Sequence, residues 1–140
     1  MQILAKILYV AAGLINIIPV TGVLGAARLE ALYGQTFVGA DLVLLMRHRA
    51  VFFGLLGGLL IAAAFQSQLR TLAAVAGLVS MGSYMLLALP ISEHGAAVQR
   101  VFWADTVGIV LLAVGWWLSS RDRLRSESRE ASDYKTNKER

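Results

Sequence analysis

The chain has 140 residues, of which 57% are hydrophobic and only 16% are charged, and its mean hydropathy is +0.64. Soluble domains are about 45–50% apolar and about 25% charged, and one small domain cannot bury so large an apolar excess in its core. These values exclude an ordinary water-soluble enzyme and predict a protein in contact with the lipid bilayer. Because basic residues mark the cytoplasmic side of a membrane protein, the net charge of +4 is read as a topology signal rather than as evidence for a nucleic-acid partner.

Four apolar segments follow one another along the chain. They cover residues 7–24, 42–65, 71–89 and 101–118. A helix needs roughly 17–25 residues to cross about 30 Å of hydrocarbon; the second segment is long enough if its helix begins at Leu42, directly after the N-cap residue Asp41. A span must satisfy its backbone hydrogen bonds internally, and these continuous runs lack the alternation of barrel strands. We predict an all-α fold, a four-transmembrane-helix bundle that forms one domain over residues 1–118.

The first segment has a basic residue, Lys6, before its apolar run, as a cleaved signal peptide would. The run is longer than the apolar region of a typical signal peptide, and three further apolar segments follow it. We therefore expect this segment to be retained as a membrane anchor.

Residues 119–140 form a tail with seven basic and five acidic residues and few apolar ones. This composition predicts a solvated, largely disordered segment. The alternative is a patch that binds anionic lipid, centred on Arg121, Arg123 and Arg125, although the acidic residues weaken its field.

The basic residues are distributed unequally between the two sides that a four-span chain would have. One side holds nine, namely Lys6, Arg70, Arg121, Arg123, Arg125, Arg129, Lys135, Lys138 and Arg140. The other side holds four, namely Arg28, Arg47, Arg49 and Arg100. Because Lys and Arg accumulate on the cytoplasmic side, both termini are predicted to be cytoplasmic.

Two parts of the chain resemble each other. The matched pairs are Arg49 and Arg100, Phe52 and Trp103, Gly57 and Gly108, and the runs Ala12-Gly13-Leu14-Ile15 and Ala76-Gly77-Leu78-Val79. They predict two parallel helical hairpins related by an axis along the membrane normal. Chance is the alternative, because short apolar matches arise easily.

Small residues spaced by four favour close packing of helices in lipid. Gly54 and Gly58 form a GxxxG pair, Gly77 lies four residues after Ala73, and Gly108 lies in the fourth segment. Within one chain we expect this spacing to serve internal packing rather than a dimer interface.

Charged residues inside two segments predict a polar cluster near the outer ends of the helices. Arg47, His48 and Arg49 lie one to two turns inside the second helix, and Asp105 lies one turn into the fourth. Both helices run from outside to inside, and a charge within a span usually faces a partner or a water-filled cavity. We expect Asp105 to pair with Arg49, or failing that with Arg47. The cluster is either a structural ion pair or the floor of an outward-facing ligand or proton site.

Other polar residues are candidate contributors on the outer side. They are Asn16, Glu30, Glu93, His94 and Arg100. Asn16 and Pro19 either open the first helix toward the same cavity or only kink it, and Glu30 is expected in a short interfacial segment. No metal site and no catalytic motif is recognised, and the absence of cysteine excludes thiolate sites. Two histidines, one in a helix and one in a loop, do not predict haem.

The chain resembles the DoxX-like group of small four-helix bacterial membrane proteins. The resemblance is carried by the run Arg49-Ala before a glycine-rich span, by the run Arg100-Val-Phe-Trp-Ala-Asp105, and by four spans in about 140 residues. The resemblance covers roughly residues 6–118. It implies a bundle in the bacterial inner membrane. Some members of the group are membrane subunits of quinone-linked oxidoreductases, and many have no assigned activity. Of the candidate site residues, only Arg49 and Asp105 match the pattern of the group.

Similar sequences have also carried the name phosphopantetheine adenylyltransferase, which is a soluble α/β enzyme with an HxGH-type phosphate motif. Neither His48 nor His94 is followed by x-Gly-His. The residues therefore do not support nucleotidyltransferase activity.

Three hypotheses of function follow. The first is a non-enzymatic membrane protein that binds an apolar or lipid-like molecule, a partner membrane subunit or a second copy of itself below the polar cluster. The second is the membrane subunit of a quinone-linked oxidoreductase, with quinone as its cofactor. The third is a small proton-coupled exporter, for which Asp105 is the candidate titrating carboxylate.

Overall fold

The computed structural model describes residues 2–90 and 95–138, and within these residues every regular element is helical. The elements are α1 (Gln2–Ile17), the 3-10 helix η1 (Ile18–Leu24), α2 (Ala26–Tyr33), α3 (Ala40–Phe65), the 3-10 helix η2 (Ser67–Leu69), α4 (Arg70–Ala88) and α5 (Ala96–Lys138). The predicted all-α fold is confirmed.

Four stretches of this structure are long and apolar enough to cross a membrane. They are Gln2–Leu24, Ala40–Phe65, Ser67–Ala88 and Ala96–Asp122. Large apolar side chains such as Leu55, Leu86 and Val110 are exposed on their outer surfaces, as expected where lipid replaces water. The chain thus has the features of a multi-pass membrane protein.

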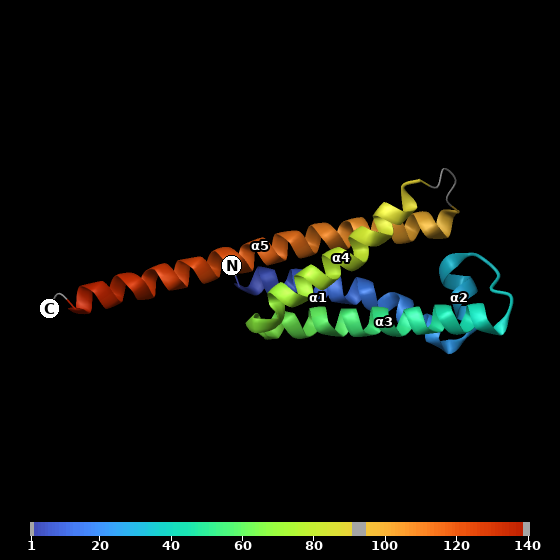
Figure 1. Ribbon diagram of the computed structural model, residues 1–140, viewed down its shortest axis with the longest axis horizontal. Helices are drawn as coiled ribbons and strands as arrows, with labels where there is room; N and C mark the ends of the chain where they lie inside the picture. The colour runs from blue at the N-terminus through green and yellow to red at the C-terminus, as the bar shows by residue number, and fades with distance from the viewer. Residues whose placement is uncertain (1, 91–94, 139–140) are drawn as a thin grey trace.

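The bundle has two distinct ends (Figure 1). At the tail end, α1 begins, α3 turns into α4, and α5 leaves the bundle. At the opposite end, here called the α2 end, α2 lies beside the start of α5. The helices α1 and α4 each pack against both α3 and α5. This arrangement agrees with two parallel hairpins, α1–α3 and α4–α5, related by an axis along the bundle.

Glycines bring the two helices of the first hairpin into close approach. A Cβ atom on Gly13 would lie 2.7 Å from Cγ1 of Ile61 and 2.9 Å from the backbone oxygen of Gly57. A Cβ atom on Gly57 would lie 2.7 Å from Cγ1 of Ile17. Neither position has room for a side chain, so these glycines set the distance between α1 and α3.

The second hairpin has the same pair of contacts. A Cβ atom on Gly77 would lie 2.5 Å from Cδ2 of Leu112, and one on Gly108 would lie 2.6 Å from the Sδ atom of Met81. The alignment that matches the glycines of the two hairpins also matches the side chains that they contact. This correspondence favours a genuine repeat over chance similarity.

Of the predicted packing glycines, Gly77 and Gly108 therefore lie at tight contacts. Gly54 faces Val20, whose Cγ2 atom would lie 3.1 Å from an added Cβ, whereas a Cβ on Gly58 would meet no described atom within 4 Å. The GxxxG pair is thus not the closest helix contact. Its neighbour Gly57 has that role, because it points toward α1 and Gly58 does not.

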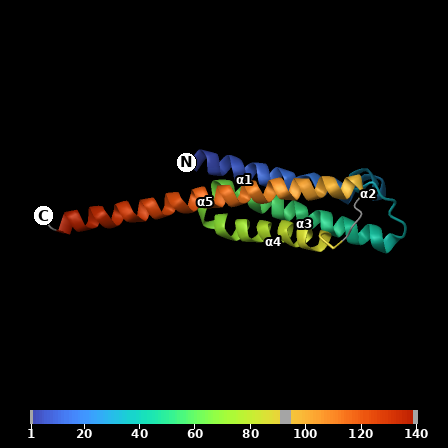
Figure 2. The same cartoon turned by 90° about the horizontal axis from the view of Figure 1, so that it is seen from above.

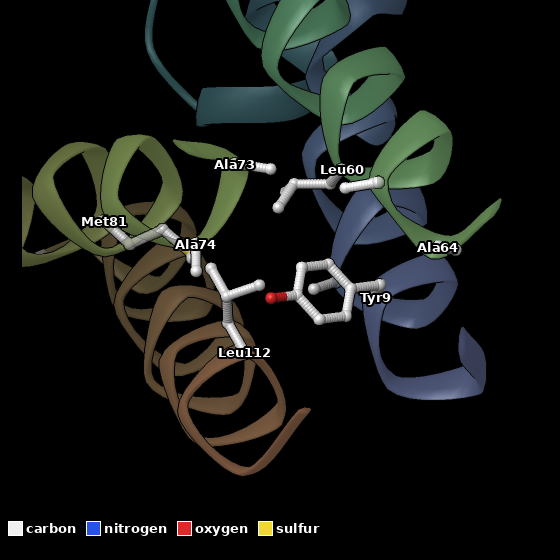
Figure 3. Close-up of a cluster of buried hydrophobic side chains, with 9 residues drawn as sticks. Tyr9, Leu60, Ala64, Ala73, Ala74, Met81 and Leu112 are labelled. Carbon is white, nitrogen blue, oxygen red and sulfur yellow. The ribbon is translucent and has the colours of Figure 1, made fainter. Parts of the chain in front are cut away.

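A core of small side chains fills the centre of the bundle toward the tail end (Figure 3). Its buried members are Tyr9, Ala12, Leu60, Ala63, Ala64, Ala73, Ala74, Met81 and Leu112. The alanines keep the helices close, and the larger side chains of Tyr9, Leu60 and Leu112 occupy the remaining space.

Arg70 connects three helices at the tail end although its side chain is only 4% exposed. Its Nε and Nη2 atoms donate to the carbonyls of Ala63 and Ala64 at 3.2 and 3.3 Å, in the last turn of α3. Its Nη1 atom donates to Oε1 of Gln2 at 3.0 Å, and the Tyr9 hydroxyl donates to the Arg70 carbonyl at 3.0 Å. Carbonyls at a helix C-terminus lack partners within the helix, and a cation there is favoured by the helix dipole.

Where the sequence predicts a largely disordered tail, α5 continues as a helix to Lys138. Both views show this extension projecting beyond the rest of the bundle (Figures 1 and 2). Its sequence is rich in Arg, Glu and Lys, which are strong helix formers. Their intrinsic helix propensity favours this extension.

Replacing Arg70 by Met should reduce the free energy of unfolding by about 2–4 kcal/mol, because the α3 carbonyls and Gln2 lose a charged donor in a buried place. Arg121→Met is the matched control, since Arg121 is exposed and lies over the Trp117 ring, where its loss should cost less than about 1 kcal/mol. Denaturant unfolding in detergent measures both. Equal stability of the two variants would contradict the role of Arg70.

The adjacent glycines of α3 provide a second comparison. Gly57→Ala should destabilise the bundle by about 1–3 kcal/mol, because its methyl group would overlap α1. Gly58→Ala should be neutral or stabilising by up to about 1 kcal/mol, because it gains helix propensity in open space. The same unfolding assay decides, and a Gly57→Ala protein as stable as Gly58→Ala would rule out the close approach.

Candidate functional site

Two pockets lie in the α2 half of the bundle and share Phe53 and Asp105 in their linings. The vestibule pocket, of about 240 Å³, lies between α1–η1, α2 and α5, with Asn16, Tyr33 and Arg100 among largely apolar lining residues. The lateral pocket, of about 310 Å³, lies between α3 and α4. The two spaces thus meet at Phe53 and Asp105, of which Asp105 is the polar one.

Asp105 is held inside α5 and is only 8% exposed. It lines one pocket together with the guanidinium group of Arg49. The tight contact of Gly108 with Met81, less than one turn further along α5, fixes this face of the helix against α4. Asp105 is therefore positioned by packing, and it lines both pockets.

Arg49 lies in the lateral pocket and is half-buried. Its Cζ atom is 5.3 Å from the ring centroid of Phe53 and 5.8 Å from that of Tyr84, within the range of cation–π attraction. Among the described residues, Arg49 and Asp105 share the pocket without a direct ion pair. The expectation of direct pairing is therefore corrected: rings from α3 and α4 hold the guanidinium group on one side of the pocket, apart from the carboxylate.

Arg47 and His48 do not join this site. The Nε atom of Arg47 donates to the carbonyl of Val23 at 2.8 Å, which ties α3 to the end of η1. The exposed ring of His48 meets the edge of Phe52, with ring centroids 4.7 Å apart. Successive residues of a helix point about 100° apart, so three consecutive polar residues cannot face one pocket. The predicted four-residue cluster is reduced to Arg49 and Asp105.

Two of the predicted outer contributors, Asn16 and Arg100, line the vestibule pocket together with Asp105. Asn16 is 3% exposed, and its Nδ2 atom donates to the Ala12 carbonyl at 3.0 Å. The α-helix ends at Ile17, and a 3-10 helix with Pro19 at its start continues the span, so the backbone changes form beside the pocket. Glu30 lines neither pocket, and Glu93 and His94 lie outside the described residues.

Two tyrosines of the site were not found from the sequence. Tyr33 ends α2 and lines the vestibule pocket, and Gly34, with φ of 65°, turns the chain back at that point. Burial raises the pKa of the Tyr33 phenol above 10.0. The charge of Arg49 opposes this increase, and the charge of Asp105 adds to it. The phenol is therefore protonated at neutral pH and can donate a hydrogen bond. Tyr84 reaches from α4 to the Val98 carbonyl of α5 at 3.5 Å. Tyrosines at the ends of apolar segments near a predicted charge are the signal that could have indicated both.

The described residues contain no group of three or more His, Asp or Glu side chains that could hold a metal ion. Each pocket has apolar walls and is lined by one arginine and by Asp105. Such a combination can hold the polar head of an amphiphile or exchange a proton at the carboxylate. It suits binding better than group transfer.

No protein-family model matches the chain, and neither a curated protein nor a solved structure does. The resemblance to the DoxX-like group therefore depends on the residues themselves.

Proposed function

We propose that the protein belongs to the DoxX-like group and lies in the bacterial inner membrane with both termini in the cytoplasm. The excess of Lys and Arg at the tail end supports this orientation. The α2 end, with both pockets, then faces outward.

We further propose that the vestibule pocket binds a small amphiphile with a polar head and an apolar body. The observation that carries this proposal is a pocket of about 240 Å³ whose walls are apolar and whose lining includes Asp105. A buried carboxylate within a span is costly unless a cavity or a ligand makes use of it.

The lining suggests how such a ligand would lie. Arg100 and the protonated Tyr33 hydroxyl would donate to acceptors on the head, and the Asp105 carboxylate would accept from a hydroxyl or amine. The apolar body would contact side chains such as Ile15 and Leu32. Because α2 contributes Leu32 and Tyr33, this helix would cover the bound molecule.

Quinone is a second candidate for this pocket. Its two carbonyl oxygens need donors, and Tyr33 and Arg100 are donors on the lining. Quinone binding would favour a membrane subunit of a redox enzyme over a carrier of other amphiphiles.

Non-denaturing mass spectrometry of the protein, purified in a mild detergent, tests the proposal. We expect the wild-type protein to retain a small molecule, and Ala104→Trp to lose it because the indole fills the vestibule pocket. Val107→Trp, which changes an exposed position on the same helix, is the matched control and should retain it. The mass and absorbance of the molecule distinguish quinone from other amphiphiles. Equal retention by both variants, or no bound molecule in the wild-type protein, would contradict the proposal.

A further inference from the structure

The lateral pocket is the counterpart of the vestibule pocket in the other half of the repeat. The vestibule pocket lies between α1 and α5, and the lateral pocket lies between their repeat partners, α4 and α3. The alignment of the two hairpins pairs lining residues of one pocket with lining residues of the other: Asn16 with Ser80, Pro19 with Ser83, Arg100 with Arg49, and Ala104 with Phe53. Each pocket thus has an arginine at the same place, and both include Asp105.

The two pockets differ in what covers them. Three residues of α2 line the vestibule pocket, whereas α3, α4 and Asp105 alone supply the described lining of the lateral pocket. At its rim, Phe52 is 59% exposed and Leu87 is 73% exposed. The rim lies within two membrane spans and is apolar, so this pocket opens sideways toward acyl chains.

The charges inside the lateral pocket lack direct partners. No described carboxylate forms an ion pair with Arg49, whose guanidinium group lies within cation–π distance of the Phe53 and Tyr84 rings. The Ser83 hydroxyl donates to the Ser80 carbonyl at 2.9 Å, and the Ser80 side chain also lines the pocket. A cation and a carboxylate separated within one pocket fit a headgroup that carries an anion and a donor.

We propose that the lateral pocket binds the headgroup of a membrane phospholipid, with its phosphate on Arg49 and Ser80 and an ammonium or hydroxyl donor of the headgroup on Asp105. The acyl chains lie outside the pocket along Phe52 and Leu87. Arg49 suits a phosphate because its fork of N–H donors can bind two oxygens at once. The headgroup of phosphatidylethanolamine has both features, whereas the trimethylammonium group of phosphatidylcholine has no N–H donor. This site shares Asp105 with the vestibule pocket, whereas Arg49, Ser80 and Leu87 line the lateral pocket alone.

Competition between two lipids of identical acyl chains tests the proposal. The full chain is mixed in detergent with equal amounts of phosphatidylethanolamine and phosphatidylcholine, and the bound lipid is counted by non-denaturing mass spectrometry. We expect a preference of about tenfold for phosphatidylethanolamine in the wild-type protein. Arg49→Gln should abolish the preference, and Arg47→Gln, which removes the same charge two residues earlier on the same helix, should keep it. Soluble glycerophosphoethanolamine should not displace the lipid; displacement at equal concentration would point to a free anion and overturn the lipid assignment.

Two further variants keep the test decisive if Arg49→Gln does not fold. Ser83→Phe fills the lateral pocket from an exposed position of α4 and should abolish the preference. Ala104→Trp fills the vestibule pocket and should retain it, so this result separates the present proposal from the vestibule ligand. Equal binding of the two lipids by the wild-type protein, or a preference retained by Ser83→Phe, would overturn the proposal.

Discussion

Lipid gives apolar helices no hydrophobic reason to associate, so this bundle depends on close contact between backbones. One glycine in each long helix of the bundle provides such contact, namely Gly13, Gly57, Gly77 and Gly108. Toward the tail end, alanines keep the helices close and the core is filled. Toward the α2 end, within about one turn of each glycine, the lining of the pockets begins. The glycine contacts therefore lie between a filled core toward the tail end and the two pockets toward the α2 end.

The charged side chains in the two halves of the bundle have different surroundings. Arg70 is buried at the tail end with all of its hydrogen-bond partners on this chain, so its role is to hold the helices together. Arg49 and Asp105 line an open pocket without a direct ion pair between them, and the rings of Phe53 and Tyr84 lie near the guanidinium group of Arg49. A charge kept inside a membrane span without a direct partner implies a ligand more than a structural tie. The repeat places one arginine beside each pocket, with Asp105 between them.

Most of the fold could be predicted from the sequence, because continuous apolar runs have few solutions in lipid. The candidate site was only partly predictable. Helix depth brought Arg49 and Asp105 to one level, but depth does not reveal that the rings of Phe53 and Tyr84 hold the guanidinium group away from the carboxylate. Helix phase removes His48 from the site, because consecutive residues of a helix point about 100° apart. The hydrogen bonds of Arg70 depend on three helices and have no local signature in the sequence.

The absence of cysteine permits a direct test of the central proposal, that the α2 end of the bundle, which holds both pockets, faces away from the cytoplasm. Single cysteines replace Gln99, which is exposed at the α2 end, and Asn137, which is exposed on the tail helix. A membrane-impermeant maleimide added to intact bacteria should label the cysteine at position 99 and should reach the one at position 137 only after lysis. Labelling of position 137 in intact cells, with position 99 protected until lysis, would contradict the account.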